Sequence, residues 1–149
     1  EENGTYFSVD EALNIMTRHK EMPNGIAVLD SGGNVGCFLM RVAGMFPTLT
    51  DIALIGIDCG YPEGTPYEDT VYYRKLMNKY GHEKTVGMMR YHDNGIFKGF
   101  TDPIFEIYRT RFIDFSKLMR AKVVNCSMQG TLFADHLKCI PFQEWLAQK

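Results

Sequence analysis

The stretch between residues 25 and 58 constrains the fold more than any other part of the chain. A short apolar run at residues 26–29 leads into the glycine turn Ser31-Gly32-Gly33-Asn34, a segment with helical spacing follows, and a second continuous apolar run ends at Asp58. Continuous rather than alternating hydrophobicity is typical of strands that are covered on both faces, as in a parallel sheet. Strand, helix and strand within about thirty residues therefore predict a βαβ unit with a right-handed crossover.

The glycine turn is the first candidate binding site. A strand that ends in a tight turn and continues into a helix leaves backbone N–H groups pointing at one spot, with the positive end of the helix dipole behind them. Gly32 and Gly33 allow positive φ and the close approach of a ligand, while Ser31 and Asn34 add a hydroxyl and an amide. The same residue types form ordinary turns and helix caps, and the turn matches neither a P-loop nor the GxGxxG motif. The turn thus indicates either an anion site or a simple cap.

Two more polar segments follow predicted strands. The loop from Asp58 to Tyr67 is rich in glycine and proline and carries the tyrosines Tyr61 and Tyr67, and a third apolar segment ends in the amide of Asn125 and the hydroxyl of Ser127. Ligands of parallel sheets bind beyond the carboxyl ends of the strands. We therefore expect these loops and the glycine turn to face one crevice.

Caps, breakers and apolar spacing predict the remaining elements. We expect helices at residues 9–20, 35–45, 69–80, from Asp102-Pro103 onward and at 141–146, and strands at 85–91 and 96–100 around the tight turn Asn94-Gly95. Phe38, Leu39, Val42 and Met45 are expected to face the sheet, Phe142 and Trp145 to pack inward, and the stripe Ile104, Tyr108, Phe112, Phe115 and Met119 to lie in the core. Residues 1–149 are expected to form a single domain.

Composition narrows the class of partner. The chain has 45% hydrophobic and 23% charged residues with a net charge of -2, so nucleic acid is not expected as its ligand. No apolar run is long enough to cross a membrane, and the first residues lack the basic and apolar regions of a signal peptide. The four cysteines form no CxxC pair, which favours buried free thiols over a disulfide or zinc site. A cytoplasmic protein is expected.

The order of the polar segments resembles a known family. The segments are Ser31-Gly32-Gly33-Asn34-Val35-Gly36, Ile55-Gly56-Ile57-Asp58, Asp93-Asn94-Gly95, Phe105-Glu106-Ile107-Tyr108, Asn125-Cys126-Ser127 with Gly130, and Pro141-Phe142-Gln143-Glu144-Trp145-Leu146. They resemble the motility-associated (Maf-like) glycosyltransferases and the related archaeal hydroxymethylpterin diphosphokinases, and the first two also resemble bacterial sialyltransferases that use CMP-sialic acid. The resemblance covers the chain from Gly25 to its end. It implies an α/β fold, a Rossmann-like three-layer sandwich with a mostly parallel sheet and a small antiparallel hairpin, whose crevice binds a nucleotide or nucleotide sugar.

The resemblance also implies roles for single residues. Ser31, Gly32 and Gly33 would lie along the nucleotide, Asn125 and Ser127 would approach it from the last strand, and Tyr61 and Tyr67 match the two tyrosines that hold the phosphate in the sialyltransferases. A histidine is the general base in those enzymes, and either His92 or His82 would take that role here. Asp58 would orient the donor or receive a proton, or it caps the turn that follows it.

Two departures from the family pattern bear on function. Family members begin with a strand and a glycine loop that contacts the nucleotide, and nothing before Ser8 resembles that loop, so we expect the chain to begin inside the family's domain. The Maf-like loop after the second strand often carries a histidine, whereas residues 61–67 carry none.

Three functions stay open at this point. The first is a transferase that holds a nucleotide or nucleotide sugar and activates an acceptor hydroxyl, with no metal site assigned. The second is an ATP-dependent diphosphokinase-like enzyme, which would need Mg²⁺ held by carboxylates such as Asp58, Glu63 and Asp69. The third is a truncated, non-catalytic binding module that works by association with another chain, a homo-oligomer included.

Overall fold

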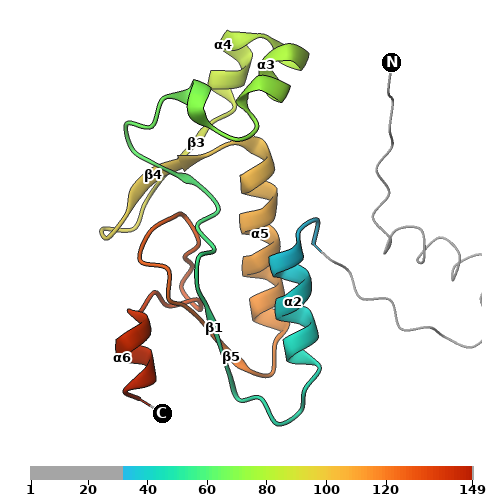
Figure 1. Cartoon of the computed structure of the whole chain (residues 1–149), viewed down its shortest axis with the longest axis vertical. Coiled ribbons are helices and arrows are strands. Elements are labelled where there is room, and N and C mark those ends of the chain that lie inside the picture. Colours follow the sequence, from blue (N-terminus) through green and yellow to red (C-terminus); the bar gives the residue numbers. More distant parts are fainter. Residues whose placement is uncertain (1–31, 149) are drawn as a thin grey trace, which may run out of the picture.

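The computed structural model describes residues 32–148. Ser31, the strand expected at residues 26–29 and the helix expected at residues 9–20 lie outside the described residues. The elements follow in the order α2 (Val35–Gly44), β1 (Asp51–Leu54), β2 (Tyr61–Pro62), the 3-10 helix η1 (Tyr67–Asp69), α3 (Tyr73–Tyr80), α4 (His82–Gly87), β3 (Arg90–Asp93), β4 (Lys98–Thr101), α5 (Pro103–Leu118), β5 (Lys122–Asn125) and α6 (Phe142–Leu146). The chain is a mixed α/β protein (Figure 1).

The strands of the described part form two sheets. β1 and β5 pair in parallel, with Ile52 opposite Val123, while β2, β4 and β3 form an antiparallel sheet in that order. Helices α3 and α4 and the antiparallel sheet lie toward one end of the long helix α5, and the parallel pair lies toward its other end (Figure 1). The predicted hairpin and a parallel strand pair are therefore confirmed. A mostly parallel sheet in a three-layer sandwich stays a prediction.

The main core lies between α2, α5 and the parallel pair. Its buried members are Cys37, Met40, Leu54, Phe112, Phe115, Val123, Leu132 and Leu137. A second, smaller cluster of buried residues joins β2 to β4 and consists of Tyr61, Met89 and Phe100. The apolar stripe predicted on α5 therefore supplies two of the main core residues, Phe112 and Phe115.

The predicted inner face of α2 is wrong for two of its four residues, while the other two, Phe38 and Val42, are half-buried. Leu39 and Met45 are 58% and 64% exposed, whereas Cys37 and Met40 are buried. The reason is that α2 contacts α5 directly, so the side of α2 that carries Cys37 and Met40 is the side that packs in the core. The helix itself begins and ends close to its predicted bounds, and the side chain of Asn34 caps it by accepting a hydrogen bond from the backbone N–H of Cys37.

Two further expectations need correction. The strand predicted at residues 85–91 is wrong in its first part. α3 ends at Tyr80 with Gly81 as its C-cap at a φ of +80°, the helix α4 begins at His82, and β3 begins only at Arg90. Phe142 was expected to pack inward, yet it is 38% exposed and stacks on Trp145 with 5.8 Å between the ring centroids. The predicted start of α5 is confirmed, since the buried carboxylate of Asp102 accepts hydrogen bonds from two N–H groups of the first turn.

Candidate functional site

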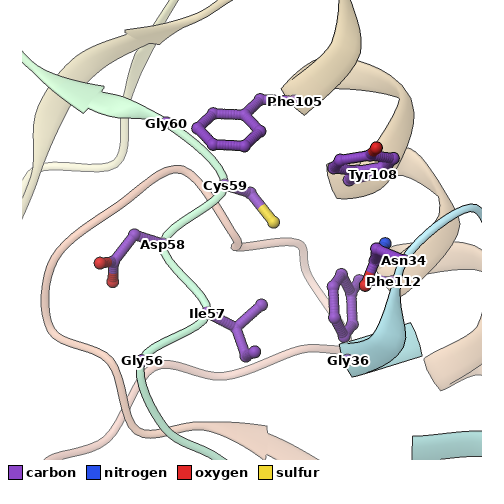
Figure 2. A pocket seen from close by; sticks show the side chains of 10 residues that line it. All are labelled: Asn34, Gly36, Gly56, Ile57, Asp58, Cys59, Gly60, Phe105, Tyr108 and Phe112. Atoms are coloured by element: carbon purple, nitrogen blue, oxygen red, sulfur yellow. The ribbon is translucent and has the colours of Figure 1, made fainter. Parts of the chain in front are cut away.

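A cavity of about 370 Å³ opens beyond the carboxyl end of β1. Its lining residues come from the start of α2, the loop after β1 and one face of α5: Asn34, Gly36, Gly56, Ile57, Asp58, Cys59, Gly60, Phe105, Tyr108 and Phe112 (Figure 2). The volume falls in the range of small-molecule sites, about 300–1,000 Å³. The cavity therefore brings Asn34, the last residue of the glycine turn, and the loop that begins at Asp58 to one crevice. Gly32, Gly33, Asn125 and Ser127 are not among its lining residues.

The start of α2 forms one side of the cavity. Gly32 and Gly33 adopt the predicted positive φ, +64° and +83°. The Oδ1 atom of Asn34 accepts a hydrogen bond from the N–H of Cys37 at 2.9 Å, and its Nδ2 donates to the Cys37 sulfur at 3.2 Å. Gly36 is needed for close packing, because a Cβ there would lie 2.9 Å from the ring of Phe112. Asn34 therefore acts as a helix cap that also faces the cavity.

The turn after β5 holds the opposite loop in place. The Ser127 hydroxyl accepts a hydrogen bond from the N–H of Ile57 at 3.1 Å. Thr131 donates its N–H to the carbonyl of Asp58 at 2.8 Å and its hydroxyl to the carbonyl of Cys59 at 2.8 Å. Gly130 has a φ of +100°, and a Cβ there would overlap the backbone of Asp58. The loops that follow β1 and β5 thus meet, and the second one fixes the first.

Asp58 and Cys59 point to different sides of their loop. Figure 2 shows the Asp58 carboxylate directed away from the aromatic rings, while the sulfur of Cys59 is directed toward the cavity. Partial burial raises the pKa of Asp58. Burial is the main cause that raises the pKa of Cys59 to about 12, and the nearby thiol of Cys37 is the second cause. The Cys59 thiol is therefore protonated at neutral pH. Cys59 also has a φ of +50°, which is uncommon outside glycine and is typical of constrained sites.

Three rings of α5 form the apolar wall. Phe105, Tyr108 and Phe112 all line the cavity. Phe105 stacks on Tyr61 with 5.1 Å between ring centroids and makes an edge contact with Tyr72 at 5.6 Å. Such tilted and edge contacts are favourable arrangements of aromatic rings. These contacts hold the ring of Phe105 in place.

The two tyrosines expected to hold a phosphate lie elsewhere in the fold. Tyr61 is buried, and its hydroxyl donates to Asp102 at 3.0 Å and accepts from the N–H of Val71 at 3.0 Å. The hydroxyl of Tyr67 lies 2.6 Å from that of Tyr91 on the antiparallel sheet. Neither tyrosine lines the cavity. Their phosphate-binding role stays a prediction, and the structure does not bring them to the other candidate residues.

Asn125 and Ser127 build the turn after β5. The amide of the buried Asn125 donates to the carbonyl of Leu132 at 2.6 Å, and its oxygen accepts from the N–H of Ser127 at 2.9 Å. These bonds place the Ser127 hydroxyl against the loop after β1. The structure thus shows both residues supporting the cavity loop from behind, and contact with a nucleotide stays a prediction for them.

His92 belongs to a separate polar network. Its Nε2 atom lies 3.0 Å from the Glu106 carboxylate and 3.3 Å from the Thr101 hydroxyl. Arg109 joins the same carboxylate at 3.4 Å and donates to the carbonyl of Thr131 at 2.7 Å. The pKa of His92 is lowered mainly by burial and secondly by the positive charge of Arg109. The network connects the hairpin to the turn that fixes the cavity loop, while His92 itself does not line the cavity.

The other candidate base and the candidate metal ligands are not gathered at the cavity. The Nδ1 atom of His82 lies 2.6 Å from the hydroxyl of Tyr73 on the α3–α4 unit. Glu63 and Asp69 lie in exposed segments outside the cavity lining. Within residues 32–148 no three His, Cys, Asp or Glu side chains come close enough to hold a metal ion together. The four cysteines are free thiols.

Sequence reasoning missed part of the cavity wall. The predicted core stripe contains Tyr108 and Phe112, which also line the cavity, but it does not contain Phe105, and the sequence does not single out Cys59. Glu106 and Arg109 were also missed, because only the fold brings them to His92 and Thr131. A signal was present in the spacing 105, 108 and 112, which places three rings on one side of a helix.

Comparison with protein-family models, curated proteins and solved structures found no match to the chain. None of the helices that the structure describes is long and apolar enough to span a membrane. The family resemblance therefore stays a prediction, and the geometry of the cavity carries the argument on function.

Proposed function

We propose that the cavity beyond β1 binds a nucleotide or nucleotide sugar and that the chain is a transferase-like domain of the glycosyltransferase type. The observation that carries this proposal is the meeting of three features in one cavity: the start of α2, the loop after β1 and the aromatic wall of α5 (Figure 2). Rings suit a base, and a helix N-terminus suits an anion at its edge. The resemblance to Maf-like proteins and sialyltransferases agrees with this assignment.

The finer fold and the location belong to the same proposal. The parallel pairing of β1 and β5 supports a Rossmann-like sheet, because crevices beyond parallel strands are where such folds bind nucleotides. Four free thiols support a reducing compartment such as the cytoplasm. The catalytic roles of Asp58 and His92 stay predictions of the proposal, since the first carboxylate points away from the rings and the second side chain lies outside the lining.

The diphosphokinase-like alternative finds less support in the cavity. A metal-bridged ATP site needs carboxylates that converge on the ion. Asp58 is the only carboxylate among the described lining residues, and Glu63 and Asp69 lie outside the cavity. The transferase-like assignment is therefore the better match to the geometry.

Thermal unfolding with millimolar CMP, UDP, ATP and GDP, each with and without Mg²⁺, tests the proposal. A ligand that binds only the folded chain adds ~2.7 kcal/mol at a hundred times its Kd, which is roughly 5–10 °C for a domain of this size. We expect a metal-independent shift with CMP or UDP. Cys59→Leu, which adds bulk at the cavity wall where the sulfur points inward, should weaken or abolish the shift, and Met128→Leu in the neighbouring exposed turn should leave it intact.

The other outcomes are equally clear. A shift with ATP that requires Mg²⁺ would favour the diphosphokinase-like alternative. If none of the nucleotides shifts the melting temperature, the proposal is overturned and a non-catalytic module is favoured. Measuring the mass of the protein in solution would then show whether copies of the chain associate. A shift that Cys59→Leu leaves unchanged would place nucleotide binding outside this cavity.

A further inference from the structure

We propose that the cavity receives the uncharged base and ribose of its ligand and that the phosphates remain outside it, at the solvent-exposed edge. This inference rests on the nucleotide site proposed above and specifies which part of the ligand the chain recognises. It differs from a phosphate-gripping site, because the affinity would come from stacking and apolar burial rather than from charge.

The charge of the lining is the first argument. No lysine or arginine lines the cavity among the residues that the structure describes, and its one ionisable carboxyl belongs to Asp58. A diphosphate taken into such a space would give up its hydration without a cation to replace it. A deeply bound phosphate is therefore unfavourable there.

The second argument concerns Arg109, whose charge acts on the lining residue Cys59. Its Nε donates to the carbonyl of Thr131 at 2.7 Å, one terminal nitrogen lies 3.4 Å from Glu106, and the other lies 3.3 Å from the carbonyl of Phe133. The guanidinium also lies over the ring of Phe133, 5.5 Å from its centroid. Moving it to a phosphate would break these bonds and release the turn that fixes the cavity loop.

The aromatic wall is the third argument. Phe105, Tyr108 and Phe112 come from one helix and line the same cavity. Phe105 and Tyr108 lie 6.3 Å apart between centroids, and Phe105 also contacts the rings of Tyr72 and Tyr61. A fixed ring gives a base a stacking partner with no ordering cost on the protein side. The wall is thus suited to a flat, uncharged ring system.

Titration calorimetry on the full chain tests the inference with matched probes. Cytidine, uridine, adenosine and guanosine are compared with their 5′-monophosphates and 5′-diphosphates, in about 50 mM and about 300 mM NaCl, across which charge recognition is strongly screened. For the base that binds, we expect the nucleoside to match its diphosphate within about threefold, and salt to change either Kd less than about twofold, because apolar burial is not screened. Tyr108→Leu, which keeps apolar bulk and removes the ring, should weaken the nucleoside about tenfold.

The control is Ile107→Ala on the exposed side of α5, which should bind as the unaltered chain does. Circular dichroism of both variants verifies folding before binding is compared. Binding of a diphosphate without its nucleoside, or a steep loss of affinity with salt, would overturn the inference while leaving the proposed nucleotide site standing. Binding of neither the nucleosides nor the nucleotides would overturn the proposed function itself. Equal losses in Tyr108→Leu and Ile107→Ala would contradict the role of the ring.

Discussion

Gly130→Ala should destabilise the chain far more than an ordinary glycine substitution. Gly130 has a φ of +100°, and the added Cβ would overlap the backbone atoms of Asp58. A left-handed backbone costs a residue with a Cβ about 1–2 kcal/mol, and forcing atoms into packed space adds about 1–3 kcal/mol. The free energy of unfolding should therefore fall by about 3 kcal/mol, which lowers Tm by roughly 6–12 °C at this chain length.

Gly64→Ala is the matched control, because Gly64 has a φ of +85° and no atom lies within 4 Å of the Cβ position. It should show the backbone cost alone, about 1–2 kcal/mol. Urea unfolding followed by circular dichroism measures both variants, and the difference between them isolates the contact with Asp58. Equal losses of stability would refute the reasoning, since they would mean that the turn after β5 does not press on the cavity loop.

Three further predictions concern single side chains. Asp102→Ala should lower the free energy of unfolding by about 2–4 kcal/mol, because it removes a helix cap and the buried acceptor of the Tyr61 hydroxyl. A urea titration measures this free energy, and a loss under about 1 kcal/mol would contradict the role of Asp102 as cap and acceptor. Burial lowers the pKa of His92 in the folded chain, so the unfolded chain takes up the proton first, and the free energy of unfolding should fall as pH decreases from about 6.5 toward the folded pKa. His92→Asn should flatten that part of the pH profile. Burial raises the pKa of Cys59 to about 12, so iodoacetamide should alkylate it at pH 8 about a thousandfold more slowly than a free cysteine, as peptide mass spectrometry would show; equal rates would contradict its burial.

Local signals in the sequence predicted the elements better than their orientation. The start of α5 follows from Asp102 and Pro103, whose cap and proline chemistry depends on neighbouring residues alone. The inner face of α2 cannot be predicted in this way, because the spacing of its apolar residues is compatible with several faces. The contact with α5 determines that the face with Cys37 and Met40 is buried. The end of α3 before Gly81 was predicted, but the short helix α4 after it was not.

In the candidate site too, local features were predicted better than the directions of side chains. The sequence predicted that the glycine turn and the loop after β1 face one crevice, and Asn34 and Asp58 do line one cavity. The sequence did not predict that Tyr61 lies in the two-residue strand β2 opposite Phe100. This pairing places the ring of Tyr61 in a buried cluster. Side-chain direction in a loop depends on such long-range pairing, and a single sequence does not contain it.

The parallel pairing of β1 with β5 has a consequence for how the chain is made. Leu54 of β1 and its partner Asn125 of β5 are 71 residues apart in the sequence. At a synthesis rate of about 5–20 residues per second, the apolar run of β1 leaves the ribosome roughly 4–14 s before its partner strand exists. The segment in between contains the antiparallel sheet, whose contacts are more local and close sooner. During translation, the apolar residues of β1 therefore stay without their partner strand until β5 has been made.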